Sequence, residues 1–532
     1  MPDRLEQYAT HFYWLAGLML LPALLIDLGN ANLFVGVDEA TRALVALEML
    51  LSDNFITPTL NGDLYYNKPP LYNWILAAFF WLSGSTHPFV MRLPNVLALL
   101  FFGWAVYHFN KPYFDRKSAL LLGFMLVTAA RVLYWESMSA YIDIALSAVV
   151  YVNFMSIYRY WTRGQLQRLF VVSYLLTAVA FMLKGLPALV FQGITLSVLF
   201  IWKRQFWKLF SIQHVLGFLA FLLPVGSYYL AYSQYNSLEQ VWLSLWNESA
   251  FRTLIYAGWE DALAKFLVKP LEMLYPYAPW SVFVLLLIQR GFWKTVRAND
   301  YLFYWTLVFF FNGLVYWTAP RIYPKYILML VPLAYTVGFY FYQKKQNSAW
   351  KAAVEILLLV VAAGITLLAL AFPFLPETKH FPHVWEKSLG VFAVLAVLLY
   401  LFIRLKSERL ILLVLILLVF RLPFSWFVWP QRAAAVEPYK QDAGRIVEIT
   451  QGAPLYYLDF YTWQYGTSWY ITKGRQEILR KATGTPGNDT FYIATRAILD
   501  RHRACTVYYE FPETVTGEGL FLVKFRDNDM QE

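Results

Sequence analysis

The sequence predicts an α-helical polytopic membrane protein with about thirteen transmembrane helices, further interfacial helices and a small C-terminal α/β domain. Three observations predict this fold class. The 532 residues are 59% hydrophobic and only 15% charged, with a mean hydropathy of +0.46, which is too apolar for a soluble protein of this length. Long apolar runs recur along the chain. The composition turns polar from about Pro430.

The first predicted span runs from Phe12 to Gly29. No small-residue cleavage motif follows it, so we interpret it as a retained span and not as a signal peptide. By the criterion of about 20 apolar residues, the predicted spans are 12–29, 90–110, 117–133, 140–159, 168–183, 187–202, 212–233, 277–290, 301–319, 323–343, 351–375, 387–403 and 409–428.

The run from Leu71 to Gly84 is ambiguous, and the distribution of positive charge decides how it is interpreted. If residues 30–90 stay outside and this run lies in the membrane interface, all basic clusters between spans face the cytoplasm. A length of about fourteen residues, with Tyr72, Trp74 and Trp81, fits an interfacial helix. The clusters are Lys111/Arg116/Lys117, Arg159/Arg163/Arg168, Lys203/Arg204/Lys208, Arg290/Lys294/Arg297, Lys344/Lys345/Lys351 and Arg404/Lys406/Arg409.

The C-terminal segment predicts a separate domain. We expect a transmembrane domain over 1–429 and a soluble domain of about 100 residues over 430–532, on the same outer face as the long loops. Within it, "YKQDAGRIVEITQ" predicts an amphipathic helix, and "APLYYLDF", "TFYIATRAIL" and "GLFLVKF" predict strands.

Composition also limits the class of function. The net charge of +10 is typical of membrane proteins with basic cytoplasmic loops and does not indicate nucleic-acid binding. A single cysteine, Cys505, excludes an internal disulfide framework and a multi-cysteine metal site. The seven histidines show no metal-ligand spacing, and no glycine-rich phosphate loop of the nucleotide type is present.

The first outer loop and the spans after it carry charged residues. Asp38 and Glu39 open a helical stretch directly after the first span, and Arg42 follows one turn later. Lys68 enters a Pro-Pro turn that leads back to the membrane surface. Asp143 begins a later span at its outer end. The structural alternative for Asp38 is a helix cap with a local ion pair.

Further cations lie in the remaining outer segments. Lys184 sits in an outer turn, where a lysine normally snorkels. The loop 234–276 supplies Arg252, and Arg321 and Lys325 lie at the outer end of another span, where marking of topology is the alternative role. Convergence of these clusters on one face favours a site that binds an anion with Lys and Arg and performs acid/base chemistry with Asp or Glu.

Several motifs resemble one known family. They are "DEA" at 38–40, "LEML" at 47–50, "ITPTLNGDLYYNKPPLYNW", Asp143 at its span start, "LKGLPAL" at 183–189 and "PRIYPKYILMLVP". In this order they resemble the GT-C superfamily of polyprenyl-phosphate-sugar glycosyltransferases, more specifically the bacterial lipid A aminoarabinose transferases and, more distantly, the protein O-mannosyltransferases. The resemblance covers roughly residues 10–345, and "NG-x-x-Y-x-x-KPPL" is its most specific part.

The resemblance implies an inverting transfer of a sugar from an undecaprenyl-phosphate type donor. By position, the implied catalytic carboxylates are Asp38, Asp143 and Glu39, with Asp38 as the acid/base residue and Glu39 as helix and site support. The implied donor phosphate-binding residues are Lys68, Arg252, Tyr65, Lys184, Arg42, Arg321 and Lys325. The sequence departs from the family pattern at two positions. Arg42 lies one residue later than in the pattern Asp-Glu-x-Arg-Tyr, and Asn67 stands where the family commonly has an acidic residue. These departures bear on which sugar and which acceptor are used more than on the type of reaction.

The resemblance also implies where the reaction takes place and with which partners. We expect a multi-pass protein of the bacterial inner membrane, a monomer, with its site and C-terminal domain on the periplasmic side. The partners are the lipid-linked donor, membrane lipids and a lipid A, glycan or protein acceptor, and the sequence does not separate these acceptors. No cofactor is required, although Asp38, Glu39 and Asp143 leave a divalent metal open.

The alternative function is a transporter or flippase of lipid-linked sugars. Such a protein is expected to place ionisable or broken segments near the bilayer midplane and to show paired repeats, whereas the charges here lie mainly at span ends. Two structural expectations follow from the glycosyltransferase interpretation. Asp38 and Lys68 share one cavity, and the run from Leu71 to Gly84 does not cross the membrane.

Overall fold

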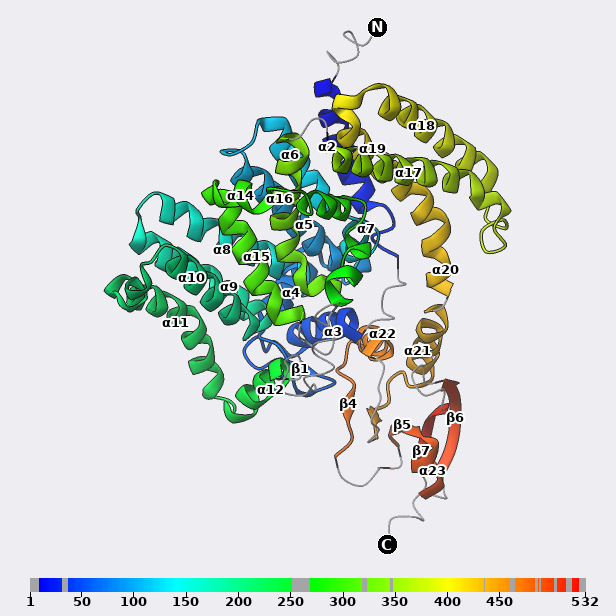
Figure 1. The fold of residues 1–532 in the computed structure, drawn as a ribbon. Helices are drawn as coiled ribbons and strands as arrows, with labels where there is room; N and C mark the ends of the chain where they lie inside the picture. The colour runs from blue at the N-terminus through cyan, green and yellow to red at the C-terminus, as the bar shows by residue number, and fades with distance from the viewer. Residues whose placement is uncertain are drawn as a thin grey trace.

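The computed structural model describes residues 9–30, 37–250, 268–317, 323–344, 348–434, 436–458, 465–483, 487, 489–501, 505–512 and 519–525. These residues form a large helical body and a small β-sheet domain, which lies at the end of the body opposite the N-terminus (Figure 1). The predicted fold class is confirmed at this level.

The helices of the body follow the apolar runs of the sequence. In chain order they are α2 (Ala9–Leu25), α3 (Val37–Ser52), α4 (Leu71–Ser83), α5 (Pro88–Asn110), α6 (Arg116–Val127), α7 (Ala130–Tyr134), η2 (Glu136–Met138), α8 (Ile142–Thr162), α9 (Leu166–Lys184), α10 (Pro187–Trp202), η3 (Phe206–Phe210), α11 (Ile212–Ser233), α12 (Glu239–Ala250), η5 (Tyr275–Tyr277), η6 (Trp280–Leu287), α14 (Phe292–Arg297), α15 (Asp300–Trp317), η7 (Pro324–Leu330), α16 (Val331–Lys344), α17 (Ala349–Ala371), η8 (Phe372–Phe374), α18 (Val384–Arg404), η9 (Lys406–Glu408), α19 (Arg409–Pro423), η10 (Phe424–Val428) and α20 (Trp429–Ala434).

Within the described residues, 8 helices are long and apolar enough to cross a membrane, or up to 9 if the bent pair 116–127 and 130–138 is one span. The other predicted runs, at 12–29, 187–202, 277–290 and 301–319, form helices that fall short of this test. The run at 277–290 forms 3-10 turns in place of a continuous α-helix, with a break at Pro279, which has no N–H to donate. The chain is therefore a multi-pass membrane protein, and the predicted count of about thirteen stays a prediction.

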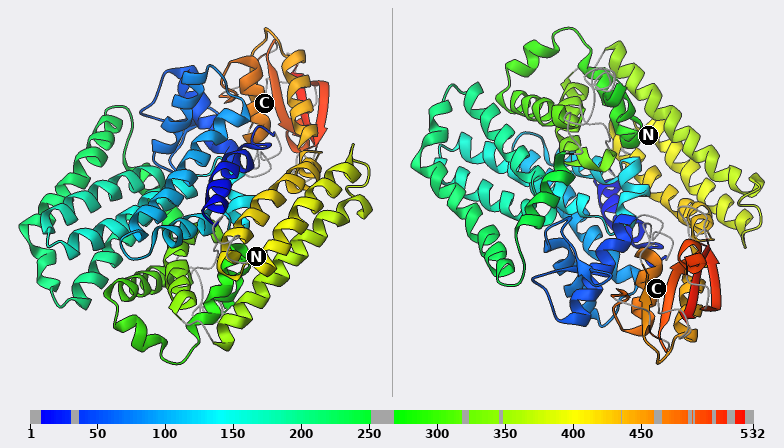
Figure 2. Two further views of the ribbon diagram at one scale, coloured as in Figure 1. Left: turned by 90° about the horizontal axis from the view of Figure 1, so that it is seen from above. Right: turned by 90° about the horizontal axis from the view of Figure 1, so that it is seen from below.

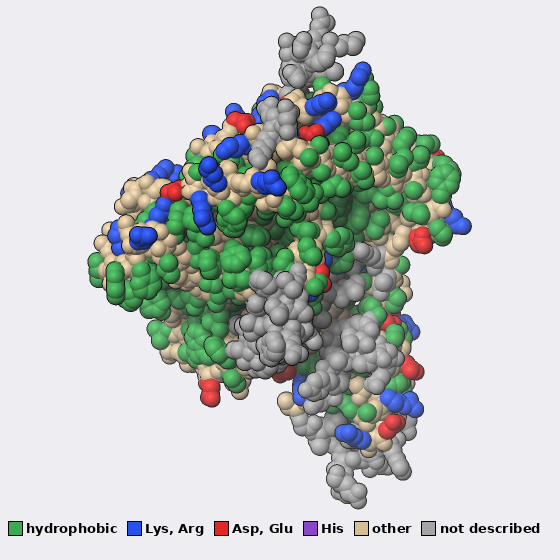
Figure 3. Space-filling model, viewed as in Figure 1, with side chains coloured by type: hydrophobic (Ala, Val, Ile, Leu, Met, Phe, Trp, Pro, Cys, Tyr) green, Lys and Arg blue, Asp and Glu red, His purple; other side chains and the backbone are tan. Residues whose placement is uncertain are grey.

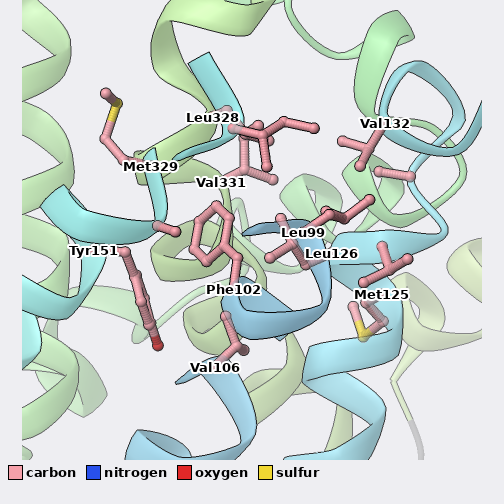
Figure 4. Packing of buried hydrophobic residues seen from close by; sticks show 14 of the residues in the cluster. Leu99, Phe102, Val106, Met125, Leu126, Val132, Tyr151, Leu328, Met329 and Val331 are labelled. Carbon is pink, nitrogen blue, oxygen red and sulfur yellow. The ribbon is translucent and has the colours of Figure 1, made fainter. Parts of the chain in front are cut away.

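The helices are arranged as a central group with two flanks. Figure 2 shows α9, α10 and α11 on one side of the molecule and α17, α18 and α19 on the opposite side. The centre is packed from α5, α6, α8 and η7, where side chains such as Phe102, Tyr151 and Leu328 meet (Figure 4). Helices α5 and α6 approach closely at two glycines, because a Cβ on Gly123 would lie 2.6 Å from the carbonyl oxygen of Gly103.

The basic clusters of the sequence lie at one end of this body. The start of α8 meets the end of α9 through Asp143 and Lys184, so the opposite ends of both helices, with Arg163 between them, lie on the far side. Lys203 at the end of α10 pairs with Asp300 at the start of α15 on that side, at 2.6 Å. Figure 3 shows Lys and Arg side chains along the upper rim, above a broad hydrophobic band.

Helices α3 and α4 lie at the end of the body away from the basic rim. Helix α4 has 13 residues, which is too short for a span and agrees with an interfacial position. Between α3 and α4, β1 (Thr59–Leu60) and β2 (Asp63–Leu64) form an antiparallel hairpin. Its turn residues Asn61 and Gly62 both have positive φ, 53° and 78°, as a two-residue hairpin turn requires.

The C-terminal domain has a mixed five-stranded sheet of order β4-β3-β5-β7-β6. Strand β3 pairs in parallel with β4 and β5, whereas β7 pairs antiparallel with β5 and β6. The predicted helix and the strands at "APLYYLDF" and "GLFLVKF" are confirmed, whereas "TFYIATRAIL" is a strand only up to Thr495 and continues as a helix from Arg496. The elements α22, α23, β4 and β6 were not foreseen. The elements are α21 (Glu437–Ile449), β3 (Leu455–Tyr457), α22 (Tyr465–Arg475), β4 (Arg480–Lys481), β5 (Phe491–Thr495), α23 (Arg496–Arg501), β6 (Cys505–Pro512) and β7 (Gly519–Phe525).

The C-terminal domain docks on α3, α4 and the hairpin. Helix α22 packs against α3, and the ring of Trp469 lies 5.8 Å from the ring of Phe80 on α4. The hydroxyl of Tyr457 donates to Asp63 at 3.4 Å. The domain therefore supports the elements that follow the first span.

Candidate active site

A small cavity brings together charged residues from five parts of the chain. Its wall is formed by Asp38 and Arg42 of α3, Lys68 after the hairpin, Tyr141, Ile142 and Asp143 at the start of α8, Lys184 at the end of α9, and Tyr326 of η7. Asp38 and Lys68 thus share a cavity, which was the main structural expectation from the sequence.

Two lysines hold the two carboxylates. The Nζ of Lys325 lies 2.7 Å from Asp38 and 3.7 Å from Asp143, and Lys184 pairs with the other oxygen of Asp143. Lys325, Asp143 and Lys184 are each more than 90% buried, so water screens the two pairs made by Asp143 only weakly.

Aromatic rings form the remaining wall around the two ammonium groups. Lys325 lies 4.1 Å from the centre of the Tyr141 ring, and Lys184 lies 4.2 Å from the centre of the Tyr326 ring. Such contacts stabilise a cation by about 0.5–2 kcal/mol. Tyr141 and Tyr326 were not predicted as site residues, although both stand within two positions of a predicted one.

Asp38 is the carboxylate most accessible from the cavity. Its side chain is 59% exposed, and this surface lines the cavity. Burial by itself raises the pKa of this carboxyl, but the positive charges around it, that of Lys325 first, outweigh burial and lower the pKa from its ordinary value. Asp38 is therefore ionised at neutral pH.

The predicted residues Lys68, Arg42 and Tyr65 form the side of the cavity toward the hairpin. The Nζ of Lys68 lies 2.9 Å from the carboxylate of Glu248 on α12. The guanidinium of Arg42 lies 5.2 Å from the centre of the Tyr65 ring, and both side chains are 5% exposed. Arg42 reaches the cavity, whereas Tyr65 lies behind it and supports Arg42.

Glu39 points away from the cavity. Its carboxylate accepts from Arg92 Nε at 2.8 Å, from Arg92 Nη2 at 3.1 Å and from the backbone N–H of Ala140 at 2.8 Å. Both charged side chains are fully buried. Arg92 also donates to the carbonyls of Leu28, at 2.9 Å, and Asn30. The pair joins the end of the first span, α3, α5 and the segment before α8.

Glu48 plays a similar part for the hairpin. It accepts from the Thr59 hydroxyl at 2.6 Å and from the backbone N–H groups of Asn61 at 2.7 Å and Gly62 at 3.2 Å. In the sequence, only the position of Glu48 within the motif "LEML" indicated that this residue has a role near the site. Because the chain runs directly from this hairpin to Lys68, Glu48 fixes the approach of that lysine.

Two predicted residues, Arg252 and Arg321, lie outside the described residues. Among the residues that the structure describes, no group of three or more His, Cys, Asp or Glu side chains is arranged to hold a metal ion. The position between Asp38 and Asp143 is filled by the ammonium group of Lys325.

An apolar groove leads away from the charged cavity. A neighbouring pocket shares Lys68, Lys184 and Tyr326 with the cavity and extends to Val190 on α10. Val190 in turn lines a groove of about 710 Å³ between α10 and α15, whose other wall residues include Ile194, Val198 and Phe311. The turn between α9 and α10 is tight, since a Cβ on Gly185 would lie 3.2 Å from Leu245. Charged cavity and apolar groove are thus connected at a single turn.

Comparison with known proteins finds one matching family and a similar solved structure. Residues 67–228 match the family described as dolichyl-phosphate-mannose-protein mannosyltransferase. The crystal structure of ArnT from Cupriavidus metallidurans bound to undecaprenyl phosphate superposes with a TM-score of 0.69 at 17% identity, over 99% of both chains. The chain therefore has the fold of this glycosyltransferase and is similar to this family of glycosyltransferases over residues 67–228.

Two relatives show how distant the similarity of sequence is. An undecaprenyl phosphate-alpha-4-amino-4-deoxy-L-arabinose arabinosyl transferase of Proteus mirabilis is 22% identical over 69% of this chain and 65% of its own length. An uncharacterized protein of Aquifex aeolicus is 24% identical over 67% of this chain and 70% of its own length. The similarity of sequence to these relatives is thus low, whereas the fold is shared with ArnT over nearly the whole chain.

Proposed function

We propose that this protein is a GT-C glycosyltransferase that moves a sugar from a polyprenyl-phosphate donor to an acceptor at the membrane surface, with inversion at the anomeric carbon. The observation that carries the proposal is the connection of a cation-rich cavity, which also holds two carboxylates, to an apolar groove. A donor with a charged phosphate and a long apolar tail matches both parts.

The cations of the cavity have the role of holding the donor phosphate. Lys184 and Lys68 line both the cavity and the pocket that leads to the groove, so they lie where the phosphate joins the lipid tail. In the reaction the acceptor oxygen forms a bond to the anomeric carbon while the bond from that carbon to the phosphate oxygen breaks. The leaving polyprenyl phosphate gains negative charge, which the lysines stabilise.

Asp38 has the role of general base. It is ionised and accessible from the cavity, so it can accept the proton of the acceptor. Its bond to Lys325 lowers its proton affinity, and a donor phosphate that competes for Lys325 raises it again. Asp143 holds Lys184 and Lys325 in position, and Glu39 orients α3 from behind. The positive charge between the two carboxylates comes from Lys325, and we assign no role to a divalent metal.

The site is assigned to the periplasmic side of a bacterial inner membrane. The basic rim lies at the other end of the spans and marks the cytoplasmic side by the positive-inside rule. Exposed Trp81 on α4 and Trp242 and Trp246 on α12 are typical of the membrane interface. Because Glu248 on α12 contacts Lys68, this interface lies close to the cavity, which favours a lipid acceptor over a soluble one.

The test is transfer from a synthetic short-chain polyprenyl-phosphate sugar in detergent, with and without a chelator. Asp38→Asn is expected to lower kcat by about 10²- to 10⁴-fold, the usual contribution of a general base, while donor binding changes little. Lys184→Met is expected to weaken donor binding. Asp300→Asn is the matched control, because Asp300 pairs with Lys203 at the far end of the body.

Two results would count against the proposal. Full turnover by Asp38→Asn removes the base from the mechanism. Suppose that neither the natural protein nor Asp38→Asn transfers sugar from a panel of donors, although both bind lipid-linked sugars. The transporter alternative then becomes the better interpretation.

A further inference from the structure

A second charged cavity lies at the opposite end of the body, on the basic rim. It has a volume of about 270 Å³. His108 and Lys111 come from the end of α5, and Arg159 and Arg163 come from the end of α8. The proposed transfer reaction does not use these four residues.

One wall of this cavity is built from stacked tyrosines. The ring of Tyr113 stacks on that of Tyr301 at 3.7 Å, and the hydroxyl of Tyr301 donates to Asn110 at 2.7 Å. On the other side, Arg159 contacts His108 through Nη1 and Nε2 at 3.2 Å. The guanidinium of Arg159 is thereby held beside the cavity.

The cations of the cavity lack acidic partners. In the part of the chain that the structure describes, no Asp or Glu oxygen lies within 4.0 Å of Lys111, Arg159 or Arg163. On the same rim, Lys203 is paired with Asp300 at 2.6 Å. The positive-inside rule requires only that basic residues lie at the cytoplasmic ends of spans. It does not require three of them to line one cavity, and this arrangement points to an anionic ligand.

A lipid-facing stripe on α5 ends at this cavity. Leu97, Phe101 and Trp104 follow one another at helical spacing and are 48%, 45% and 53% exposed. The ring of His108, one turn further, stacks on Trp104 at 5.1 Å. A ligand with its anion among the cations can therefore lay an apolar chain along α5.

We propose that this cavity binds the headgroup phosphate of an anionic phospholipid, with the acyl chains on the α5 stripe. Arg159 and Arg163 suit a phosphate because the guanidinium group offers several donors in one plane. The volume accommodates a headgroup, and the stacked rings of Tyr113 and Tyr301 bound the cavity on one side. The site is independent of the transfer reaction at the other end of the spans.

The experiment measures binding of phosphatidylglycerol to the purified protein in neutral detergent by native mass spectrometry. Phosphatidylcholine with the same acyl chains and inorganic phosphate are the comparison ligands. The double variant Lys111→Gln/Arg163→Gln is expected to bind phosphatidylglycerol about tenfold more weakly for each cation removed, since a charge-assisted hydrogen bond contributes about 1.5 kcal/mol or more.

The matched control is Lys208→Gln/Arg290→Gln, which removes the same charge from the same rim outside the cavity. It is expected to keep the affinity of the natural protein, and phosphatidylcholine is expected to bind neither protein selectively. Equal losses in the two double variants would overturn the proposal, because general surface charge would then explain binding. Inorganic phosphate that displaces phosphatidylglycerol at equal concentration would overturn the lipid as the ligand.

Discussion

The buried pair of Glu39 and Arg92 gives the sharpest test of how the site is held together. The change is Glu39→Gln, which keeps an acceptor for the N–H of Ala140 but removes the negative charge that faces Arg92 at 2.8 and 3.1 Å. Because both side chains are fully buried, the guanidinium is left without a counter-ion and without water.

Removal of one partner from a buried ion pair costs about 3–5 kcal/mol, so the unfolding equilibrium should shift roughly a hundred- to several-thousand-fold. Arg92→Met should cost a similar amount, since it strands the Glu39 carboxylate. The double variant Glu39→Gln/Arg92→Met should lose much less than the sum of the two, because it leaves no uncompensated charge.

The assay is equilibrium unfolding of the purified protein in mixed detergent micelles, with Glu239→Gln, an exposed residue on α12, as the matched control. Transfer activity is followed in parallel, and kcat should fall more than KM rises, because the pair positions the segment before Asp143. Strictly additive losses would refute the reasoning, since they would mean that the two charges do not depend on each other.

Two further predictions concern acidity and the docking of the C-terminal domain. The free energy of unfolding should differ between the natural protein and Asp38→Asn by a constant amount above about pH 4, the usual pKa of an unfolded aspartate. The difference should shrink as the pH falls through the lowered pKa of Asp38 in the folded state. A change centred at pH 6 in unfolding experiments would contradict this. Gly62→Ala should cost about 1–2 kcal/mol for its positive φ and should loosen the C-terminal domain, because the new Cβ would lie 2.8 Å from Arg480 Cγ. Gly84→Ala is the control, because Gly84 also has a positive φ but a Cβ there would meet no neighbouring atom. Limited proteolysis should therefore cleave the C-terminal domain faster in Gly62→Ala than in the natural protein, and no faster in Gly84→Ala.

The sequence predicts the helical body well because apolar runs of span length leave little choice of structure in a membrane. Within the described residues, every predicted run forms α-helix or 3-10 helix, while the interfacial position of α4 stays a prediction with which its 13 residues agree. The run at 277–290 was wrong as a regular helix, since hydropathy does not report how prolines break hydrogen bonding. Strand β6 was missed because its alternation of apolar and polar residues is weak, with only Phe511 well buried.

The site was predictable in its composition and less so in its contacts. Positions at span ends pointed to Asp38, Asp143, Lys68, Lys184 and Lys325, and the structure brings these together. Nothing local in the sequence links Glu39 to Arg92, 53 residues away, or shows that Lys325 lies between two carboxylates. Such partners depend on how the helices pack, and packing is a property of the whole chain.

The length of the groove between α10 and α15 limits how much of the donor's lipid tail can contact the protein. Helix α10 has 16 residues, which at 1.5 Å per residue amount to about 24 Å from the turn at Gly185 to the basic rim. A tail longer than this gains no additional contact with the protein and continues into the bilayer. We therefore expect donor affinity to increase with tail length up to this limit and then to level off, so that the enzyme accepts lipid carriers of many lengths without distinguishing among the longer ones.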